Sequence, residues 1–126
     1  RGIELVIKKG RIGETYNIGG NNEWANLDVV NLLCEQIDAR FAANTELVAR
    51  FPDSPCARGE SAKSLITFVT DRLGHDTRYA INASKITAEL GYDPVEDFDS
   101  GLNKTVDWYL SNQAWWNSIQ DGSYRK

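Results

Sequence analysis

The chain has 126 residues, which suits one domain, and 41% of them are hydrophobic, enough for a folded core. Its net charge of −4 argues against a general nucleic-acid-binding protein, which usually presents a basic face. No apolar run approaches the ~20 residues that a membrane span needs, so we expect no membrane partner.

The first predicted element is a helix over residues 3–9. Ile3, Val6 and Ile7 share one of its faces, and Gly10 ends it. The chain contains no methionine and opens inside a helix. We therefore expect it to be a piece of a longer protein.

A short strand is predicted over Thr15–Ile18, and Gly19 and Gly20 close it. A glycine pair after a strand is compatible with a phosphate-binding loop or with a tight exit from the strand. The sequence has no G-x-G-x-x-G and no lysine of a P-loop, so the tight exit is favoured.

A long helix is predicted from Asn26, because apolar residues recur at helical spacing after it. These residues are Leu27, Val30, Leu33, Cys34, Ile37 and Phe41. Asn26 is a suitable N-cap, and a helix N-terminus with a short amide can also face a diphosphate. Capping alone and ligand contact both stay open for Asn26.

Residues 42–64 are predicted to be irregular, with a possible short helix over Thr45–Phe51, and the range is expected to be an insertion. Alternating apolar residues predict a strand over Leu65–Val69, and a further strand is predicted over Arg78–Ile81.

The stretch Asp71–Tyr79 between these two strands carries the only histidine of the chain, His75. The guanidinium of Arg72 can bind a phosphate through two hydrogen bonds, and Gly74 lets the backbone come close to a ligand. The imidazole of His75 can donate to a ribose hydroxyl or a phosphate. The stretch is compatible with an anion-binding turn and with a solvated charged loop.

Three further helices are predicted towards the C-terminus. One begins at residues 82–84, with Ile86 and Leu90 inward and Gly91 as its end. The next begins at residues 98–100, and a short one covers Trp115–Ile119. The inward residues of the middle helix are expected to be Leu102, Val106, Tyr109 and Leu110. Few strands among several helices indicate the α/β (mixed α and β) class.

The two cysteines do not make a disulfide framework. Cys34 falls in the apolar helical pattern and is expected in the core, whereas Cys56 is expected in a polar loop. With a single histidine, the sequence gives little support for a metal site. A reducing cytoplasm is the expected location.

Several blocks of the sequence, in order, resemble the C-terminal part of the dTDP-glucose 4,6-dehydratase family, within the extended short-chain dehydrogenase/reductase superfamily. The blocks are Glu14–Gly20, Asn26–Val30, Asp71–Asp76, Tyr79–Ile81, Lys85-Ile86, Glu89–Tyr92 with Pro94, Gly101-Leu102 with Lys104–Val106, Trp108–Leu110 and Gly122–Tyr124. The resemblance covers nearly the whole chain apart from residues 42–64.

This resemblance implies that residues 1–126 form a small C-terminal substrate-binding lobe, without the Rossmann core that holds NAD in the family. Family members convert dTDP-glucose to dTDP-4-keto-6-deoxyglucose and water. The substrate-binding positions fall here on Asn26, Asp71, Arg72, Leu73, Gly74 and His75. Arg72 would neutralise phosphate charge, and His75 would bind near the ribose or phosphate. Asp71, Leu73 and Gly74 would shape the turn.

The chain departs from the family in three ways. Leu73 stands where the family usually has proline. No tyrosine is followed four residues later by lysine, so the catalytic Tyr-x-x-x-Lys pair is missing, and so is the glycine-rich NAD fingerprint. We therefore expect no catalytic or cofactor-binding residue in this chain. The parent enzyme is expected to be a homodimer, mainly through the missing domain.

Two other functions stay open on the sequence alone. The lobe could belong to a nucleotide-sugar epimerase or decarboxylase of the same superfamily. It could also be a freestanding binding module that is not an enzyme.

Overall fold

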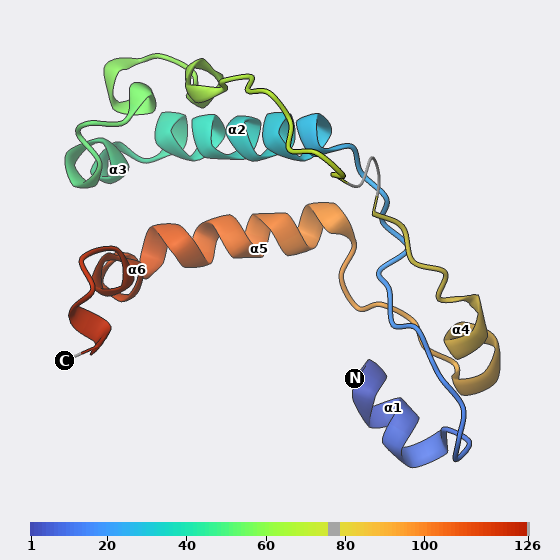
Figure 1. Cartoon of the computed structure of the whole chain (residues 1–126). Coiled ribbons are helices and arrows are strands. Elements are labelled where there is room, and N and C mark those ends of the chain that lie inside the picture. Colours follow the sequence, from blue (N-terminus) through green and yellow to red (C-terminus); the bar gives the residue numbers. More distant parts are fainter. Residues whose placement is uncertain (76–78, 126) are drawn as a thin grey trace. The chain divides into compact units, whose positions relative to one another are not determined.

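The fold is taken from a computed structural model, which describes residues 1–75 and 79–125. The chain forms two compact units (Figure 1). The first comprises Arg1–Ala25 and Asp71–Ser100, and the second comprises Asn26–Thr70 and Gly101–Lys126.

The first unit is built around helices α1 (Gly2–Lys9) and α4 (Ser84–Leu90). Ile86 is fully buried, and Leu90 is nearly so, as predicted. The helix α4 ends at Gly91, whose φ of 68° lies in the left-handed region that glycine favours. The core consists of Ala83, Ile86 and Leu90, with Leu5, Val6, Tyr16 and Tyr92 packed against it.

Two extended segments of the first unit lie side by side. The side-chain amide of Asn17 donates to the carbonyl of Asn82, with 3.3 Å between nitrogen and oxygen. A Cβ atom added to Gly19 would lie only 2.3 Å from Cγ2 of Ile81. The absence of a side chain at Gly19 therefore serves close packing, which agrees with the interpretation of this glycine as a structural residue.

None of the three predicted strands is present in the described residues, so the α/β class is not confirmed. Residues 15–18 and 79–81 are extended without strand pairing, while Arg78 lies outside the described residues. Leu65 ends a 3₁₀ helix, and Phe68 and Val69 are largely exposed. Alternating apolar residues make a strand only where a neighbour can satisfy the backbone hydrogen bonds, and the sequence pattern could not reveal that neighbour.

The second unit is helical. It contains α2 (Asn26–Ala43), α3 (Thr45–Arg50), the 3₁₀ helices η1 (Pro55–Arg58) and η2 (Ala62–Leu65), α6 (Gln113–Gln120) and η3 (Ser123–Arg125). The helix α5 (Phe98–Ser111) begins in the first unit and continues in the second. Cys34 and Phe41 of α2 are buried as predicted, and so is Val106 of α5, but Tyr109 is half exposed and does not point into the core.

An ion pair and hydrogen bonds of Arg40 connect α2 with α5 inside the second unit. The Arg40 guanidinium lies 2.5 Å from a carboxylate oxygen of Asp107 and 3.0 Å from the side-chain oxygen of Asn103. The hydrogen bond from Arg40 lowers the pKa of the Asp107 carboxyl. Arg50 of α3 donates to the carbonyl of Leu110. These contacts explain how two helices far apart in the sequence are held together.

Residues 42–64 have more regular structure than predicted, since α3, η1 and η2 all lie here and pack on α2 (Figure 1). The predicted short helix is confirmed as α3. Cys56 lies in η1 and not in a polar loop. Whether this range is an insertion stays a prediction.

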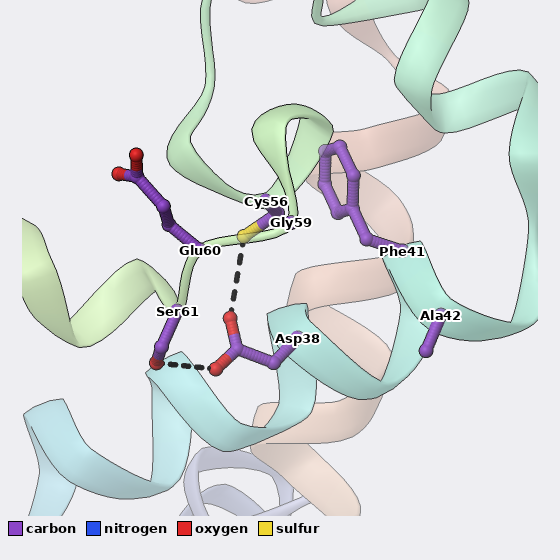
Figure 2. A pocket seen from close by; sticks show the side chains of 7 residues that line it. All are labelled: Asp38, Phe41, Ala42, Cys56, Gly59, Glu60 and Ser61. Carbon is purple, nitrogen blue, oxygen red and sulfur yellow. Dashed lines mark hydrogen bonds between the residues drawn. The ribbon is translucent and has the colours of Figure 1, made fainter.

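Asp38 of α2 holds this segment in place (Figure 2). Its carboxylate accepts from the Ala62 amide at 2.8 Å, from the Ser61 hydroxyl at 2.5 Å and from the Cys56 thiol at 3.2 Å. The backbone hydrogen bond from Ala62 and the hydroxyl of Ser61 lower the pKa of Asp38. Burial, together with Asp38, raises the pKa of the Cys56 thiol. A raised pKa favours the protonated thiol over the reactive thiolate.

Replacing Asp38 with alanine is expected to destabilise the chain by about 1–3 kcal/mol, because three donors lose their common acceptor. The free energy of unfolding from urea titration measures this. Asp53→Ala, which removes an exposed carboxylate from the same segment, is the control and should change stability by less than about 0.5 kcal/mol. Equal losses for the two variants would contradict the anchoring role of Asp38.

Candidate functional site

The candidate site in the first unit is a tight turn over residues 71–75. Leu73 and Gly74 form the bend, and Gly74 has a φ of 73°, which glycine adopts without strain. The amide of His75 donates to the carbonyl of Arg72 at 3.3 Å, and this bond closes the turn. The turn is therefore present, as the sequence analysis predicted.

The side chain of Asp71 holds the turn together through two contacts. One of its carboxylate oxygens accepts from the Arg72 amide at 2.8 Å and lies 2.6 Å from Nδ1 of His75. Because a carboxylate can only accept, the proton of this contact sits on Nδ1, and Nε2 stays available to a ligand. The side chain of His75 is only partly exposed, with 38% of its surface accessible. The sequence predicted that Asp71 shapes the turn, but not that it orients the imidazole.

The guanidinium of Arg72 lies in solvent and forms no ion pair within the described part of the chain. Leu73 is fully exposed, which suits a residue that contributes only its backbone. An exposed guanidinium, on the same turn as an imidazole that is oriented by a carboxylate, can bind a phosphate group through charge-assisted hydrogen bonds.

The hydrogen bond from His75 is the main reason that the pKa of Asp71 lies below its ordinary value of 3.8. A lowered pKa in the folded state means that the contact stabilises the turn above pH 3.8 and is lost as the pH falls through the lowered value. We expect the ¹⁵N shifts of the His75 ring to change in this acid range as Asp71 is protonated. In Asp71→Asn that acid transition should be missing, and its persistence would contradict the contact.

Asn26 is the first residue of α2 and belongs to the second unit, whereas residues 71–75 belong to the first. Asn26 is exposed, and Asp28 lies in the first turn of the helix, where a negative charge suits the dipole. An exposed amide at the start of a helix of 18 residues can bind an anion. The role of Asn26 in substrate binding stays a prediction.

The sequence analysis did not identify a hollow in the first unit. It has a volume of about 420 Å³ and is lined by Gly20, Asn21, Asn22, Glu23, Tyr79, Ala80 and Ile81. Asn21 adopts a φ of 54°, in the left-handed region that asparagine tolerates better than most residues. The two asparagines after the glycine pair were the available signal, because such residues mark a loop that turns sharply.

The described part of the chain contains no cluster of three or more His, Cys, Asp or Glu side chains that could hold a metal ion. No helix in the described residues is both long enough and apolar enough to span a membrane.

The chain is similar to known 4,6-dehydratases over nearly its whole length. The family described as GDP-mannose 4,6-dehydratase matches residues 1–105. A dTDP-glucose 4,6-dehydratase from Neisseria meningitidis serogroup B is 47% identical over 125 residues, which are 99% of this chain and 32% of that protein. A dTDP-glucose 4,6-dehydratase from Escherichia coli is 48% identical over 124 residues, or 98% of this chain and 31% of that protein.

A solved structure gives the same result. The chain is similar to the crystal structure of dTDP-glucose 4,6-dehydratase from Bacillus anthracis in complex with NAD, with a TM-score of 0.70 and 39% identity. The similarity covers 94% of this chain and 30% of that chain. The chain thus spans about a third of the length of the relatives that it matches, in their C-terminal region.

Proposed function

We propose that this chain, which belongs to the GDP-mannose 4,6-dehydratase family, is the nucleotide-sugar-binding lobe of a dTDP-glucose 4,6-dehydratase. The identity of 46–48% with three such dehydratases, over at least 98% of the chain, carries this proposal. The parent enzyme is a hydro-lyase that converts dTDP-glucose to dTDP-4-keto-6-deoxyglucose and water.

In this proposal the turn over residues 71–75 binds the diphosphate. Arg72 neutralises phosphate charge, and Nε2 of His75 contacts a phosphate or the ribose while Asp71 fixes the ring. Asn26 adds its amide and the N-terminal end of α2. The exposed position of Arg72 and the contact between Asp71 and His75 support these roles.

The chemical steps take place on residues outside this chain. The sequence contains no Tyr-x-x-x-Lys pair and no glycine-rich fingerprint, so its residues do not fit NAD. We propose that another part of the parent enzyme binds NAD and performs catalysis. We further propose that the parent enzyme is a homodimer and that it is located in the cytoplasm. The two free cysteines are compatible with a reducing compartment.

Titration with dTDP, followed by ¹H–¹⁵N spectra of the 126-residue chain, tests the proposal. We expect the amide signals of Asn26 and of residues 71–75 to shift on addition of dTDP, because both match the substrate-binding positions of the family. UDP serves as the control for the base, and inorganic phosphate serves as the control for simple anion binding. Shifts confined to other residues, or equal responses to phosphate and dTDP, would contradict a nucleotide site here.

A further inference from the structure

Helix α1 packs on the first unit through only part of its surface. Leu5 and Val6 are partly buried against the core around Ile86 and Leu90 of α4. Gly2 lies on this side too, and a Cβ atom there would come within 2.8 Å of Ile18. The core of the first unit therefore covers this part of the apolar surface of the helix.

The apolar surface of the same helix extends beyond this packed side. Ile3 and Ile7 are one helical turn apart and lie on the same side, and at about 100° per residue Val6 lies about 60° from Ile3 and about 100° from Ile7. The apolar side chains therefore form one wide face, and the stripe of Ile3 and Ile7 is the part of it that the core does not cover. Their side chains are 70% and 79% exposed. The remaining side of the helix is polar, and there Lys8 and Glu4 form an ion pair at 2.6 Å.

An amphipathic helix turns its apolar face towards a core, and an apolar face that is wider than the contact with that core is normally covered by a further element. Exposed isoleucines four residues apart leave a continuous apolar strip in water, and burying each would be favourable. The matched relatives extend far beyond this segment, because the chain accounts for only 32% of the Neisseria protein and 30% of the Bacillus chain. A covering element can therefore come from the rest of the same polypeptide.

We infer that the stripe of Ile3 and Ile7 on α1 is a docking surface for the remaining two thirds of the parent enzyme, the part proposed above to bind NAD. This inference rests on the proposed function. It names the surface through which the sugar-nucleotide lobe is fixed to the catalytic part. The element that docks on this stripe is apolar.

The test compares one double substitution in two settings. A chimera is made from a full-length relative by replacing its matched region with this chain, and I3K/I7K is introduced into the chimera and into the 126-residue chain. In the chimera, two lysines would be buried without partners, so we expect the melting temperature to fall by at least about 5 °C. In the short chain the lysines stay in water, and we expect a change of less than about 2 °C.

The control is Leu65→Lys, since Leu65 is 69% exposed but lies in the second unit. A drop in the chimera for I3K/I7K but not for Leu65→Lys supports the inference. Equal effects of I3K/I7K in both settings, or no effect in the chimera, would overturn it. Sedimentation velocity of the 126-residue chain tests whether a second copy covers the stripe. A chain that is dimeric and becomes monomeric with I3K/I7K would show that it does, and this result would also overturn the inference.

This outcome is independent of nucleotide binding. Because Ile3 and Ile7 lie outside the proposed nucleotide site, the titration with dTDP should give the same Kd for the I3K/I7K chain as for the unchanged chain. Loss of docking with intact binding would leave the proposed function standing, and absent binding in the unchanged chain would count against the proposed function alone.

Discussion

Replacing Arg72 with alanine is expected to weaken the binding of dTDP by about tenfold to a hundredfold, the scale of one charge-assisted contact to a phosphate. The guanidinium is exposed and forms no ion pair within the described residues, so its loss should leave the fold intact. The turn should also persist, because Asp71 and Gly74 shape it without the Arg72 side chain. Isothermal titration calorimetry measures the effect.

Two further variants sharpen this prediction. Arg72→Lys keeps the charge but loses the paired hydrogen bonds, so it should recover only part of the affinity. Arg58→Ala removes an equally long basic side chain from the second unit, where it pairs with Glu60, and should leave the Kd unchanged. If Arg58→Ala weakened binding as much as Arg72→Ala, the attraction would be a general charge effect and the turn would not be the site.

Replacing Ile86 with alanine is expected to destabilise the first unit by about 2–4 kcal/mol. Ile86 is fully buried and lies at the centre of the core, so the change removes apolar contacts and leaves a cavity. Since small domains are stable by only about 5–15 kcal/mol, this is a large share of the total. Thermal and urea unfolding of the 126-residue chain measure the loss.

Two controls accompany this prediction. The first makes a smaller change at Ile86 itself, and the second truncates an exposed apolar side chain elsewhere in the first unit. Ile86→Val removes a single methylene and should cost about 0.5–1.5 kcal/mol. Val95→Ala acts on a side chain that is 69% exposed, and it should change stability by less than about 0.5 kcal/mol. A loss for Val95→Ala equal to that for Ile86→Ala would show that Ile86 is not the centre of the core.

The helices were predictable because their signals are local. The helix α4 illustrates this: Ile86 and Leu90 are one turn apart, and Gly91 can adopt the left-handed conformation that ends a helix. The starts of α2 and α5 were also found from residues at their first turn, Asn26 and Phe98. Each signal involves residues within one or two turns, so no tertiary contact was needed.

The strands were not predictable from the same kind of pattern. The run Leu65–Val69 is rich in apolar and β-branched residues, but a strand also needs a partner, and pairing depends on residues far away in the sequence. In the described residues, segments 14–20 and 79–83 approach each other through Gly19 and Ile81 without forming paired strands. We predicted a mixed α and β fold because local apolar patterns were interpreted as strands, although such patterns do not show whether a pairing partner is present.

For the candidate site, the residue types pointed to a phosphate-binding turn, and the positive φ of Gly74 agrees with a tight bend. The spacing of four residues between Asp71 and His75 is compatible with their contact but did not require it. The 2.6 Å distance between the carboxylate and Nδ1 was visible only in three dimensions. The joint use of Asn26 and the turn stays a prediction, which the titration tests.

By itself, the sequence determined the helices, the turn and the membership in a dehydratase family, because each depends on neighbouring residues or on blocks matched in order. Only the tertiary structure decided that Ile3 and Ile7 of α1 face solvent, whereas Ile86, which is also at helical spacing, is in the core as predicted. It also showed that Asp38 anchors the segment after α2. Burial and partnership depend on which distant segments meet, and a one-dimensional pattern does not contain that information.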